Sequence, residues 1–245
     1  MQAEFTRELV LSACMVDFTG RWRPSAILES MQDLATAHSE ELGAGRALML
    51  QRGIIWILSR THLHMQEYPM MDERVRIRTW PGTANRFFFP RYFVMERPDG
   101  RRLGAASQLW LLLDLNVQSV IPPSKANLTF PDISHIPAPL PTPDRVMRVD
   151  SGQHFAQTRT AVYTDLDVNG HVNNARYADW VCDLLPLEML RTHCVENLLL
   201  NYAKEVLPGP PIRCTLTLAG ARFSLLGEAN SNEPPCFEAG GTLLA

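Results

Sequence analysis

The sequence predicts an α+β protein built of two similar halves, in each of which one long helix is followed by a set of antiparallel strands. Three observations lead to this fold class. A helical hydrophobic pattern precedes four strand-like runs, a proline-rich segment divides the chain, and the same order of elements recurs after it. The chain has 245 residues and 46% hydrophobic side chains, which is enough for a sizeable core in each half.

The first half opens with a predicted helix over Pro24–Leu42, because apolar residues recur there at helical spacing. Pro24 suits the first turn of a helix, and Gly43 suits its end. In the second of the strand-like runs that follow, apolar residues alternate with arginines, as on a half-buried sheet. The predicted strands are Ile54–Met65, Arg74–Trp80, Phe87–Val94 and Leu103–Leu113.

A proline-rich segment separates this half from the rest of the chain. Seven of the 18 prolines fall between Pro122 and Pro143. Such a run disfavours both a helix and a central strand, so we expect an extended linker. The predicted organisation is an N-terminal half over residues 1–121, a linker over residues 122–150 and a C-terminal half over residues 151–245.

The second half repeats the plan of the first. A strand-like stretch at Thr158–Val162 leads through a turn into a predicted helix over Asn173–Leu185, which Pro186 ends. The predicted strands after this helix are Leu198–Val206, Ile212–Leu218, Arg222–Ala229 and Phe237–Leu244.

A short sequence echo connects the two halves. The segment Asp17–Arg21 precedes the helix of its half and lies 150 residues before Asp167–His171. The aspartate and the glycine match, whereas the asparagine and histidine of the second copy are replaced by threonine and arginine in the first. We therefore infer an internal duplication in which only the second copy keeps the chemical groups.

Composition excludes several classes of protein. A formal net charge of −3 and a pI near 6.2 argue against a nucleic-acid-binding protein, which would carry a strongly basic domain. The five cysteines are odd in number and form no CxxC pair, so we expect neither a disulfide framework nor a zinc site, but reduced thiols in a cytoplasmic protein. The N-terminus carries acid where a targeting peptide would carry base, so we expect no targeting peptide. No apolar run approaches about 18 residues, so we expect no membrane span.

The densest polar cluster of the sequence is Thr164–Asn174, which holds two carboxylates, three amides and one imidazole. Asp165, Asn173 and Asn174 are common residue types in turns and helix caps, and that structural interpretation fits them somewhat better than a functional one. His171 is different, because it precedes a helix start whose free N–H groups could hold an electrophilic carbonyl. The cluster therefore predicts an active site around His171.

This cluster also carries a resemblance to a known family. Asp165–Asn174, followed by Tyr177, resembles the active-site motif of the acyl-acyl carrier protein (acyl-ACP) thioesterases of plastids and bacteria. Segments of the first half resemble that family's N-terminal half in the same order. They are Trp56–Arg60, Tyr68-Pro69, Thr79–Pro81 and Ser107–Trp110. The resemblance extends over most of the chain, from about residue 5 to residue 244.

The resemblance implies a double hotdog fold, in which each half wraps a curved antiparallel sheet around its long helix. It places the catalytic residues at Asp167, Asn169 and His171, with Glu205 as a further catalytic carboxylate. Without the resemblance, Glu205 would be interpreted as an ordinary surface glutamate at a strand end. Several plant members carry a cysteine directly after that glutamate, but this chain has Val206, so a thiol there cannot be essential.

The activity implied is hydrolysis of the fatty acyl-ACP thioester, which releases the free fatty acid and terminates fatty acid synthesis. Acyl carrier protein is then the partner, and no cofactor or metal is required. N–H groups near His171, together with Asn169, would stabilise the oxyanion. Either Asp167 or Glu205 would act as base or nucleophile, and the sequence does not choose between them.

Two alternative functions differ from hydrolysis of acyl-ACP. The Asp-x-x-Gly-His pattern also resembles single-hotdog enzymes that act on acyl-CoA, but two fused copies and the tryptophan motifs favour the carrier-protein family. A catalytically silent acyl-binding protein would be expected to lose the motif, which is present. The pair His62 and His64 lies on one face of a predicted strand and is interpreted as sheet surface, not as a metal site.

The first half lacks the catalytic histidine and is aromatic-rich, so we expect it to bind the acyl chain, around Trp56 and Phe87–Phe89. Arg74, Arg76 and Arg78 alternate onto one strand face and are candidates for docking acyl carrier protein, although a solvated sheet face fits them better. Acyl-chain length is left open, as is a homodimer, because such sheets can also pair between chains.

Overall fold

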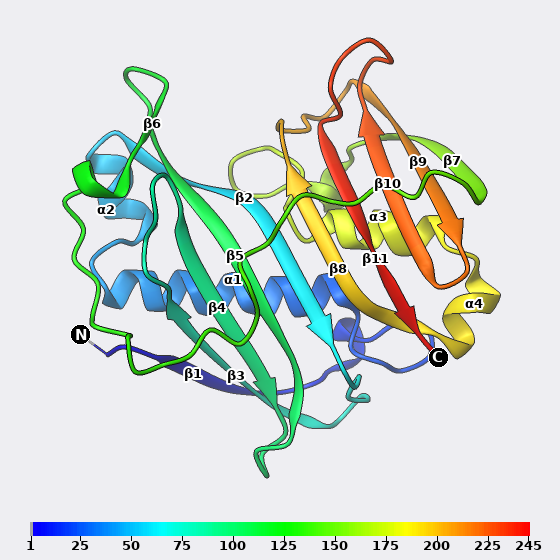
Figure 1. Cartoon of the computed structure of the whole chain (residues 1–245), viewed down its shortest axis with the longest axis horizontal. Coiled ribbons are helices and arrows are strands. Elements are labelled where there is room, and N and C mark those ends of the chain that lie inside the picture. The colour runs from blue at the N-terminus through cyan, green and yellow to red at the C-terminus, as the bar shows by residue number, and fades with distance from the viewer. Residues whose placement is uncertain (1) are drawn as a thin grey trace. The chain divides into compact units, whose positions relative to one another are not determined.

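The computed structural model describes residues 2–245, which form two compact units (Figure 1). Unit 1 comprises the chain up to Trp22 together with Glu29–Pro143, and unit 2 comprises Arg23–Leu28 together with Asp144–Ala245. The main division between the units therefore lies inside the predicted linker. The assignment of Arg23–Leu28 to unit 2 was not foreseen. Among the described residues, no helix is long and apolar enough to cross a membrane.

Unit 1 is an antiparallel sheet with one long helix, as predicted. The strand order is β1-β3-β4-β5-β2, and β6 pairs with β5. In Figure 1 the long helix α1 lies across this sheet. The elements are β1 (Phe5–Val10), η1 (Ala13–Met15), α1 (Pro24–Glu41), α2 (Arg46–Gln51), β2 (Ile54–Met65), β3 (Arg74–Pro81), β4 (Phe89–Glu96), β5 (Arg102–Asp114), β6 (Ser119–Ile121) and η2 (Pro123–Lys125).

The predicted helix and the four predicted strands of this half are confirmed, with ends displaced by no more than two residues. The sequence analysis missed β1, α2 and β6. In β1 most side chains are exposed, so the strand lacks the hydrophobic alternation that would have revealed it. Both α2 and β6 are too short to establish a period.

Unit 2 also consists mainly of antiparallel strands, in the order β8-β11-β10-β9-β7. The order of its main elements repeats that of unit 1, which agrees with the inferred duplication. The elements are β7 (Gln153–Thr160), η3 (Tyr163–Asp165), α3 (Arg176–Leu184), α4 (Leu187–Thr192), β8 (Cys194–Tyr202), β9 (Pro211–Ala219), β10 (Arg222–Glu228) and β11 (Phe237–Leu244).

Three predicted elements of this half have wrong bounds. The strand-like stretch predicted at Thr158–Val162 is β7, which runs from Gln153 to Thr160. The strand predicted over Leu198–Val206 is β8, which begins earlier and ends at Tyr202. Beyond Tyr202 the ladder breaks, because two successive backbone N–H groups donate to the same carbonyl oxygen, that of Cys236. The helix predicted from Asn173 begins at Arg176, because the preceding residues form a hydrogen-bonded turn.

The core of unit 2 is organised around α3. Tyr177 and Trp180 are buried on one face of this helix, together with Val181 and Leu184. Their rings pack on Phe237 at the start of β11, with centroid distances of 4.4 Å from Tyr177 and 5.7 Å from Trp180. Burial of each large apolar side chain contributes about 1.5–3 kcal/mol, so this cluster fixes the helix on the sheet.

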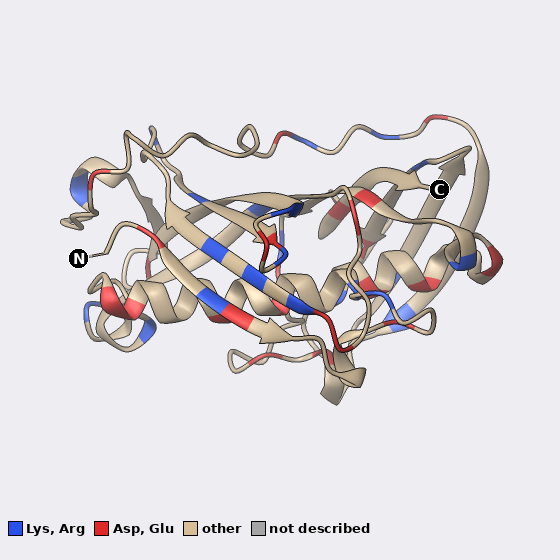
Figure 2. Cartoon of the chain, turned by 90° about the horizontal axis from the view of Figure 1, so that it is seen from below, with Lys and Arg blue, Asp and Glu red and all other residues tan. Residues whose placement is uncertain are grey.

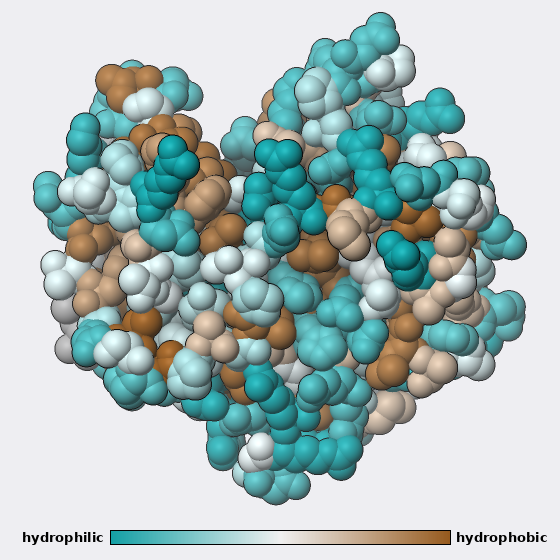
Figure 3. Space-filling model, in the orientation of Figure 1, coloured by the Kyte–Doolittle hydropathy of each residue, from teal (hydrophilic) through white to brown (hydrophobic). Residues whose placement is uncertain are grey.

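Unit 1 has a separate apolar cluster around α2, β2, β4 and β5. Its buried members are Met49, Phe89, Leu112 and Ala126, with Trp56 and Phe130 among those packed against it. At the same end of the unit, the hairpin of β5 and β6 exposes apolar side chains, which appear brown at the upper left of Figure 3. The exposed members are Leu115, Val117 and Val120.

The proline-rich segment is extended, as predicted, but it is held against the sheets. In unit 1, the buried Ser107 hydroxyl donates to the carbonyl oxygen of Pro141 at 2.7 Å. In unit 2, the Val149 N–H donates to the Ser224 hydroxyl at 2.9 Å, and Val146 is buried. Proline carbonyls remain available as acceptors, so the segment can be fixed without forming a strand.

Two of the three arginines of β3, Arg76 and Arg78, lie in ion pairs. Arg76 makes two hydrogen bonds to Glu8 of β1, at 3.0 and 2.8 Å. Arg78 bridges Glu4 and Glu96 at 2.8 and 3.0 Å. Figure 2 shows basic positions along β3 beside β1, which carries one acidic and one basic position. Because Arg76 and Arg78 are paired with acids, this face supports the solvated-sheet interpretation better than a cationic docking surface.

A buried polar network joins α1 to the sheet of unit 1. His38 and Arg91 are both buried, and an Nη1–H of Arg91 donates to His38 Nδ1 at 3.2 Å. With Nδ1 as acceptor, the proton of the neutral ring lies on Nε2, which donates to the Gln2 carbonyl oxygen at 3.1 Å. The Arg91 guanidinium also donates to Thr79 and Ser39. Burial lowers the pKa of Arg91 to about 10.

We expect stability to decrease as the pH falls below about 6.5, the ordinary pKa of histidine. Burial lowers the pKa of His38; Arg91 acts in the same direction, whereas the Gln2 carbonyl and Glu41 oppose it. The unfolded chain therefore binds the proton more readily than the folded protein does. The contribution of neutral His38 is complete above 6.5 and is lost as the pH falls through the lowered folded value.

The measurement is urea denaturation at about pH 7.5 and about pH 5.5, for the wild type and for His38→Gln. The variant should lose about 1–3 kcal/mol at the higher pH, because a buried hydrogen-bonded group is replaced. It should also depend less on pH than the wild type. Equal pH dependence in the two proteins would show that His38 does not carry the effect.

Candidate active site

The motif that connects η3 to α3 forms a tight turn around one carboxylate. The backbone N–H of Asp167 donates to the His171 carbonyl oxygen at 2.9 Å, and the Gly170 N–H donates to the Asp167 carbonyl oxygen at 3.0 Å. Gly170 has a φ of 78°, a conformation that glycine adopts without steric cost. The turn therefore returns the chain so that residues 167 and 171 lie side by side.

The Asp167 side chain holds this turn from within. Its Oδ1 accepts the backbone N–H groups of Asn169 at 2.8 Å and His171 at 3.4 Å, and its Oδ2 accepts Nδ2–H of Asn169 at 3.3 Å. Both carboxylate oxygens are thus engaged by N–H donors. Asp167 consequently sets the positions of the other two predicted residues, and the structure brings all three together.

The corresponding turn of unit 1 has the same hydrogen bonds without the same chemistry. Oδ1 of Asp17 accepts the backbone N–H groups of Thr19 at 2.7 Å and Arg21 at 3.2 Å, and Gly20 has a φ of 82°. The aspartate and the glycine therefore specify the shape of the turn in both halves. The imidazole and the amide are specific to the second copy.

Glu205, the fourth predicted residue, lies against His171. The distance between Glu205 Oε2 and His171 Nε2 is 3.3 Å, and the two side chains are 61% and 30% exposed, respectively. The segment after β8 reaches the turn because the Val172 N–H donates to the Val206 carbonyl oxygen at 2.9 Å. The structure therefore unites residues separated by 34 positions in the sequence.

The remaining polar residues of the motif have structural contacts. Asp165 accepts the Val162 N–H through its side chain and the Asn173 N–H through its carbonyl oxygen, at 2.9 and 2.8 Å. Oδ1 of Asn173 accepts the Ala175 N–H at 2.8 Å just before α3. These contacts support the interpretation of Asp165 and Asn173 as turn and capping residues.

Two aromatic residues support the helix start. The Tyr202 hydroxyl donates to the Asn174 carbonyl oxygen at 3.1 Å, and its ring lies 5.5 Å from that of Tyr177. Burial strongly raises the pKa of Tyr177, which therefore stays neutral. The sequence analysis did not identify Tyr202 as part of the site, because a tyrosine at a strand end carries no distinctive signal.

Neither a thiol nor a metal is indicated by the described part of the chain. No group of three or more His, Cys, Asp or Glu side chains could hold a metal ion within residues 2–245. None of the five cysteines, all of which the structure describes, forms a disulfide, and none is part of the turn at residues 167–171. Burial raises the pKa of Cys214 to about 11, so that thiol is protonated at neutral pH.

As arranged, the site offers a carboxylate and an imidazole in contact, beside a second carboxylate that accepts three N–H groups of its own turn. Such a pair can exchange a proton with a bound water molecule and donate a hydrogen bond to a developing oxyanion. These are the two requirements for attack of water on an activated acyl group.

Several proteins of similar sequence are named as thioesterases or hydrolases of acyl carrier protein substrates. Curated relatives include an oleoyl-acyl carrier protein thioesterase of Coriandrum sativum, 24% identical over 200 residues, covering 73% of this chain and 53% of that protein. Another is a dodecanoyl-[acyl-carrier-protein] hydrolase of Umbellularia californica, 26% identical over 209 residues, covering 80% of this chain and 54% of that protein. The chain thus spans about half the length of the curated relatives it matches.

Solved structures show the fold. The crystal structure of an acyl-ACP thioesterase from Bacteroides thetaiotaomicron matches with a TM-score of 0.85 at 24% identity, covering 99% of this chain and 98% of that chain. The 12:0-ACP thioesterase of Umbellularia californica matches with a TM-score of 0.80 at 20% identity, covering 99% and 94%. This chain therefore has the fold of these thioesterases.

Family models cover most of the sequence. The model of the acyl-ACP thioesterase N-terminal domain matches residues 2–122, and that of the C-terminal domain matches residues 149–232. The predicted active-site turn and Glu205 both lie within the second match. The chain therefore belongs to the acyl-ACP thioesterase family.

Proposed function

We propose that this protein hydrolyses the thioester of fatty acyl-ACP, releasing the free fatty acid and ending its elongation. The observation that carries the proposal is the contact between His171 and Glu205 beside the turn of Asp167, in a chain of this family. The curated relatives named as oleoyl- and dodecanoyl-carrier-protein hydrolases support the substrate class.

In the proposed reaction, water attacks the thioester carbonyl carbon while a carboxylate accepts its proton. The resulting oxyanion collapses, the carbon–sulfur bond breaks, and the thiolate of the carrier's prosthetic arm takes up a proton. Side-chain N–H groups of Asn169 and His171 stabilise the oxyanion, because the backbone N–H groups of both residues donate to Asp167. Because a thiolate leaves readily, the site needs no strong acid for the leaving group.

We assign the role of general base to Glu205 and an orienting role to Asp167. Both oxygens of Asp167 already accept N–H groups, so this carboxylate serves to hold the turn. The Glu205 carboxylate is 61% exposed and contacts His171, so water can reach it. The sequence alone had left both carboxylates as candidates.

For the fold we propose a double hotdog, with one hotdog formed by each unit. The support is the shared order of elements and the matching turns at Asp17 and Asp167. We further propose that unit 1 receives the acyl chain, because it has an apolar cluster that includes Trp56, Phe89 and Phe130. Acyl carrier protein is then the partner that delivers the substrate.

We expect the purified protein to release fatty acid from acyl-ACP with a higher kcat/KM than from the matching acyl-CoA. The carrier contributes binding energy that the nucleotide cannot provide. The measurement is a thiol-release assay with both thioester classes over a series of chain lengths. A preference for acyl-CoA at every length would instead favour the alternative, an acyl-CoA thioesterase of the hotdog superfamily.

His171→Ala and Asp167→Asn should lose nearly all turnover while folding normally. Each change removes a preorganised donor or its orienting group, which typically costs on the order of 100-fold or more in rate. Asp17→Asn is the matched control, because it alters the same kind of turn in unit 1. Turnover of that control, and of Cys182→Ser, should stay near the wild-type value.

Circular dichroism and thermal melting establish folding in these variants, and single-turnover assays measure the chemical step. Near-normal turnover in a folded His171→Ala protein would remove the basis of the assignment. An equal loss in Asp17→Asn would mean that loosening either turn damages the fold in general.

Glu205→Gln should lower kcat by about 100-fold with little change in KM, because the amide cannot accept the proton from water. A nucleophilic Asp167 predicts a different result. The variant would then be only mildly impaired, and quenching followed by mass spectrometry would trap an acyl group on Asp167.

A further inference from the structure

Glu205 lies on a segment that belongs to no helix or strand, although its carboxylate must stay close to His171. The segment leaves β8 at Tyr202 and is held to β11 at once. The backbone N–H groups of Ala203 and Lys204 both donate to the Cys236 carbonyl oxygen at 2.9 Å. These two hydrogen bonds fix the chain on the N-terminal side of Glu205.

On the C-terminal side, the segment is held by Val206. Its carbonyl oxygen accepts the Val172 N–H at 2.9 Å, directly after His171. The Val206 side chain is only 1% exposed, whereas Leu207 is 50% exposed. A buried apolar residue between two exposed neighbours anchors the backbone, because releasing it would return its apolar surface to water.

An ion pair adds a third attachment. The distance between Lys204 Nζ and Glu233 Oε2 is 3.4 Å, and Glu233 belongs to the connection between β10 and β11. The other carboxylate oxygen of Glu233 accepts Nδ2–H of Asn230 at 3.1 Å. These contacts with Asn230 and Lys204 lower the pKa of Glu233, so its carboxylate is charged at neutral pH.

Unit 1 holds the equivalent segment in the same way. The N–H groups of Gln66 and Glu67 both donate to the Leu103 carbonyl oxygen, at 2.8 and 3.2 Å. The Trp22 N–H donates to the Pro69 carbonyl oxygen at 3.0 Å, as Val172 does to Val206 in unit 2. Tyr68 therefore occupies the position that corresponds to Glu205.

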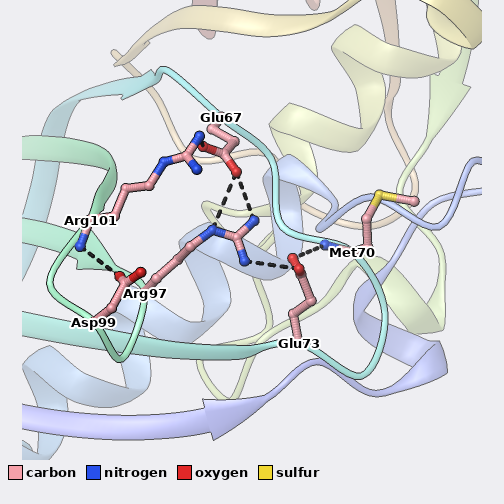
Figure 4. Close-up of polar contacts among 6 residues, drawn as sticks. All are labelled: Glu67, Met70, Glu73, Arg97, Asp99 and Arg101. Atoms are coloured by element: carbon pink, nitrogen blue, oxygen red, sulfur yellow. Dashed lines mark hydrogen bonds and ion pairs between the residues drawn. The ribbon is translucent and has the colours of Figure 1, made fainter.

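In both units the shared backbone hydrogen bonds form a clamp on the segment, but in unit 1 the charges of its ion pairs are reversed (Figure 4). Glu67 accepts from Arg97 at 2.7 Å and also pairs with Arg101 on the β4–β5 connection. Arg97 further pairs with Glu73 at 2.8 Å, whose other oxygen accepts the Met70 N–H. The backbone clamp is thus common to both units, with acid on the segment in one and base in the other.

We propose that Lys204 and Val206 are positioning residues that hold Glu205 against His171, through the ion pair with Glu233 and the buried valine side chain. The inference rests on the proposed function of Glu205. It also explains why valine can stand at position 206: the position serves packing and backbone pairing, neither of which needs a thiol.

The exposed ion pair allows a test that leaves the core intact. Lys204→Glu and Glu233→Lys should each lower kcat by about 2- to 5-fold with KM nearly unchanged, because exposed ion pairs are individually weak. The double variant Lys204→Glu with Glu233→Lys should recover most of this loss. Unit 1 shows that an acid is compatible with this backbone position.

Val206→Ala should lower kcat by about 10-fold, because it removes the buried methyl groups that fix the segment. Val206→Cys, which is closer to valine in size, should recover most of that loss. Leu207→Ala is the matched control, since its side chain is half exposed on the same segment, and its kcat should equal that of the wild type.

The decisive measurement places Lys204→Glu and Val206→Ala in a Glu205→Gln background. If both residues act through Glu205, neither should lower kcat further there. Full additivity, or loss of kcat in Leu207→Ala equal to that in Val206→Ala, would overturn the proposal. Retained kcat in all single variants, with an active wild type, would overturn it while leaving the proposed function intact.

A readout independent of turnover tests the positioning role of Lys204 and Val206 separately from the proposed thioesterase function. The His171 ring resonances, recorded by NMR at one fixed pH, report whether a carboxylate lies beside the ring. In Val206→Ala and Lys204→Glu they should move toward their positions in Glu205→Gln, whereas Leu207→Ala should leave them unchanged. Unmoved resonances in the two variants would refute the positioning role even if the wild type hydrolyses no acyl-ACP.

Discussion

The arrangement of the site depends on one interaction, the capture of backbone N–H groups by an aspartate side chain within a five-residue turn. The same interaction occurs at Asp17 and Asp167, each time with a glycine at positive φ. Because the aspartate pairs donors that the turn would otherwise leave free, the turn keeps its shape when the other residues change. The chain can therefore replace histidine by arginine in one copy and keep the fold.

This separation of shape from chemistry explains how the two units differ. In unit 1 the turn, the backbone clamp and the strand order are all present, yet the positions of the imidazole and the carboxylate are taken by Arg21 and Tyr68. In unit 2 the same scaffold brings His171 and Glu205 to 3.3 Å. The same backbone scaffold thus carries the imidazole and the carboxylate in one copy only.

Electrostatics also differ between the two units. The segment of unit 1 is fixed by a network in which Arg97 bridges Glu67 and Glu73, and these hydrogen bonds lower the pKa of Glu73. The segment of Glu205 in unit 2 has the Lys204–Glu233 pair and the buried Val206. A network of several charges restrains a loop more than one exposed pair does, so packing carries more of the restraint in unit 2.

The sequence by itself determined the α+β class, the two repeated sets of elements and the turn around His171, because hydrophobic period, proline content and turn chemistry are local properties. It placed β8 four residues too late and missed β1, whose exposed edge position leaves no alternation. Only the tertiary structure decided that Glu205 meets His171 and that both oxygens of Asp167 accept N–H donors. Those facts depend on hydrogen bonds such as that from Val172 to Val206, which join segments distant in sequence and leave no local pattern.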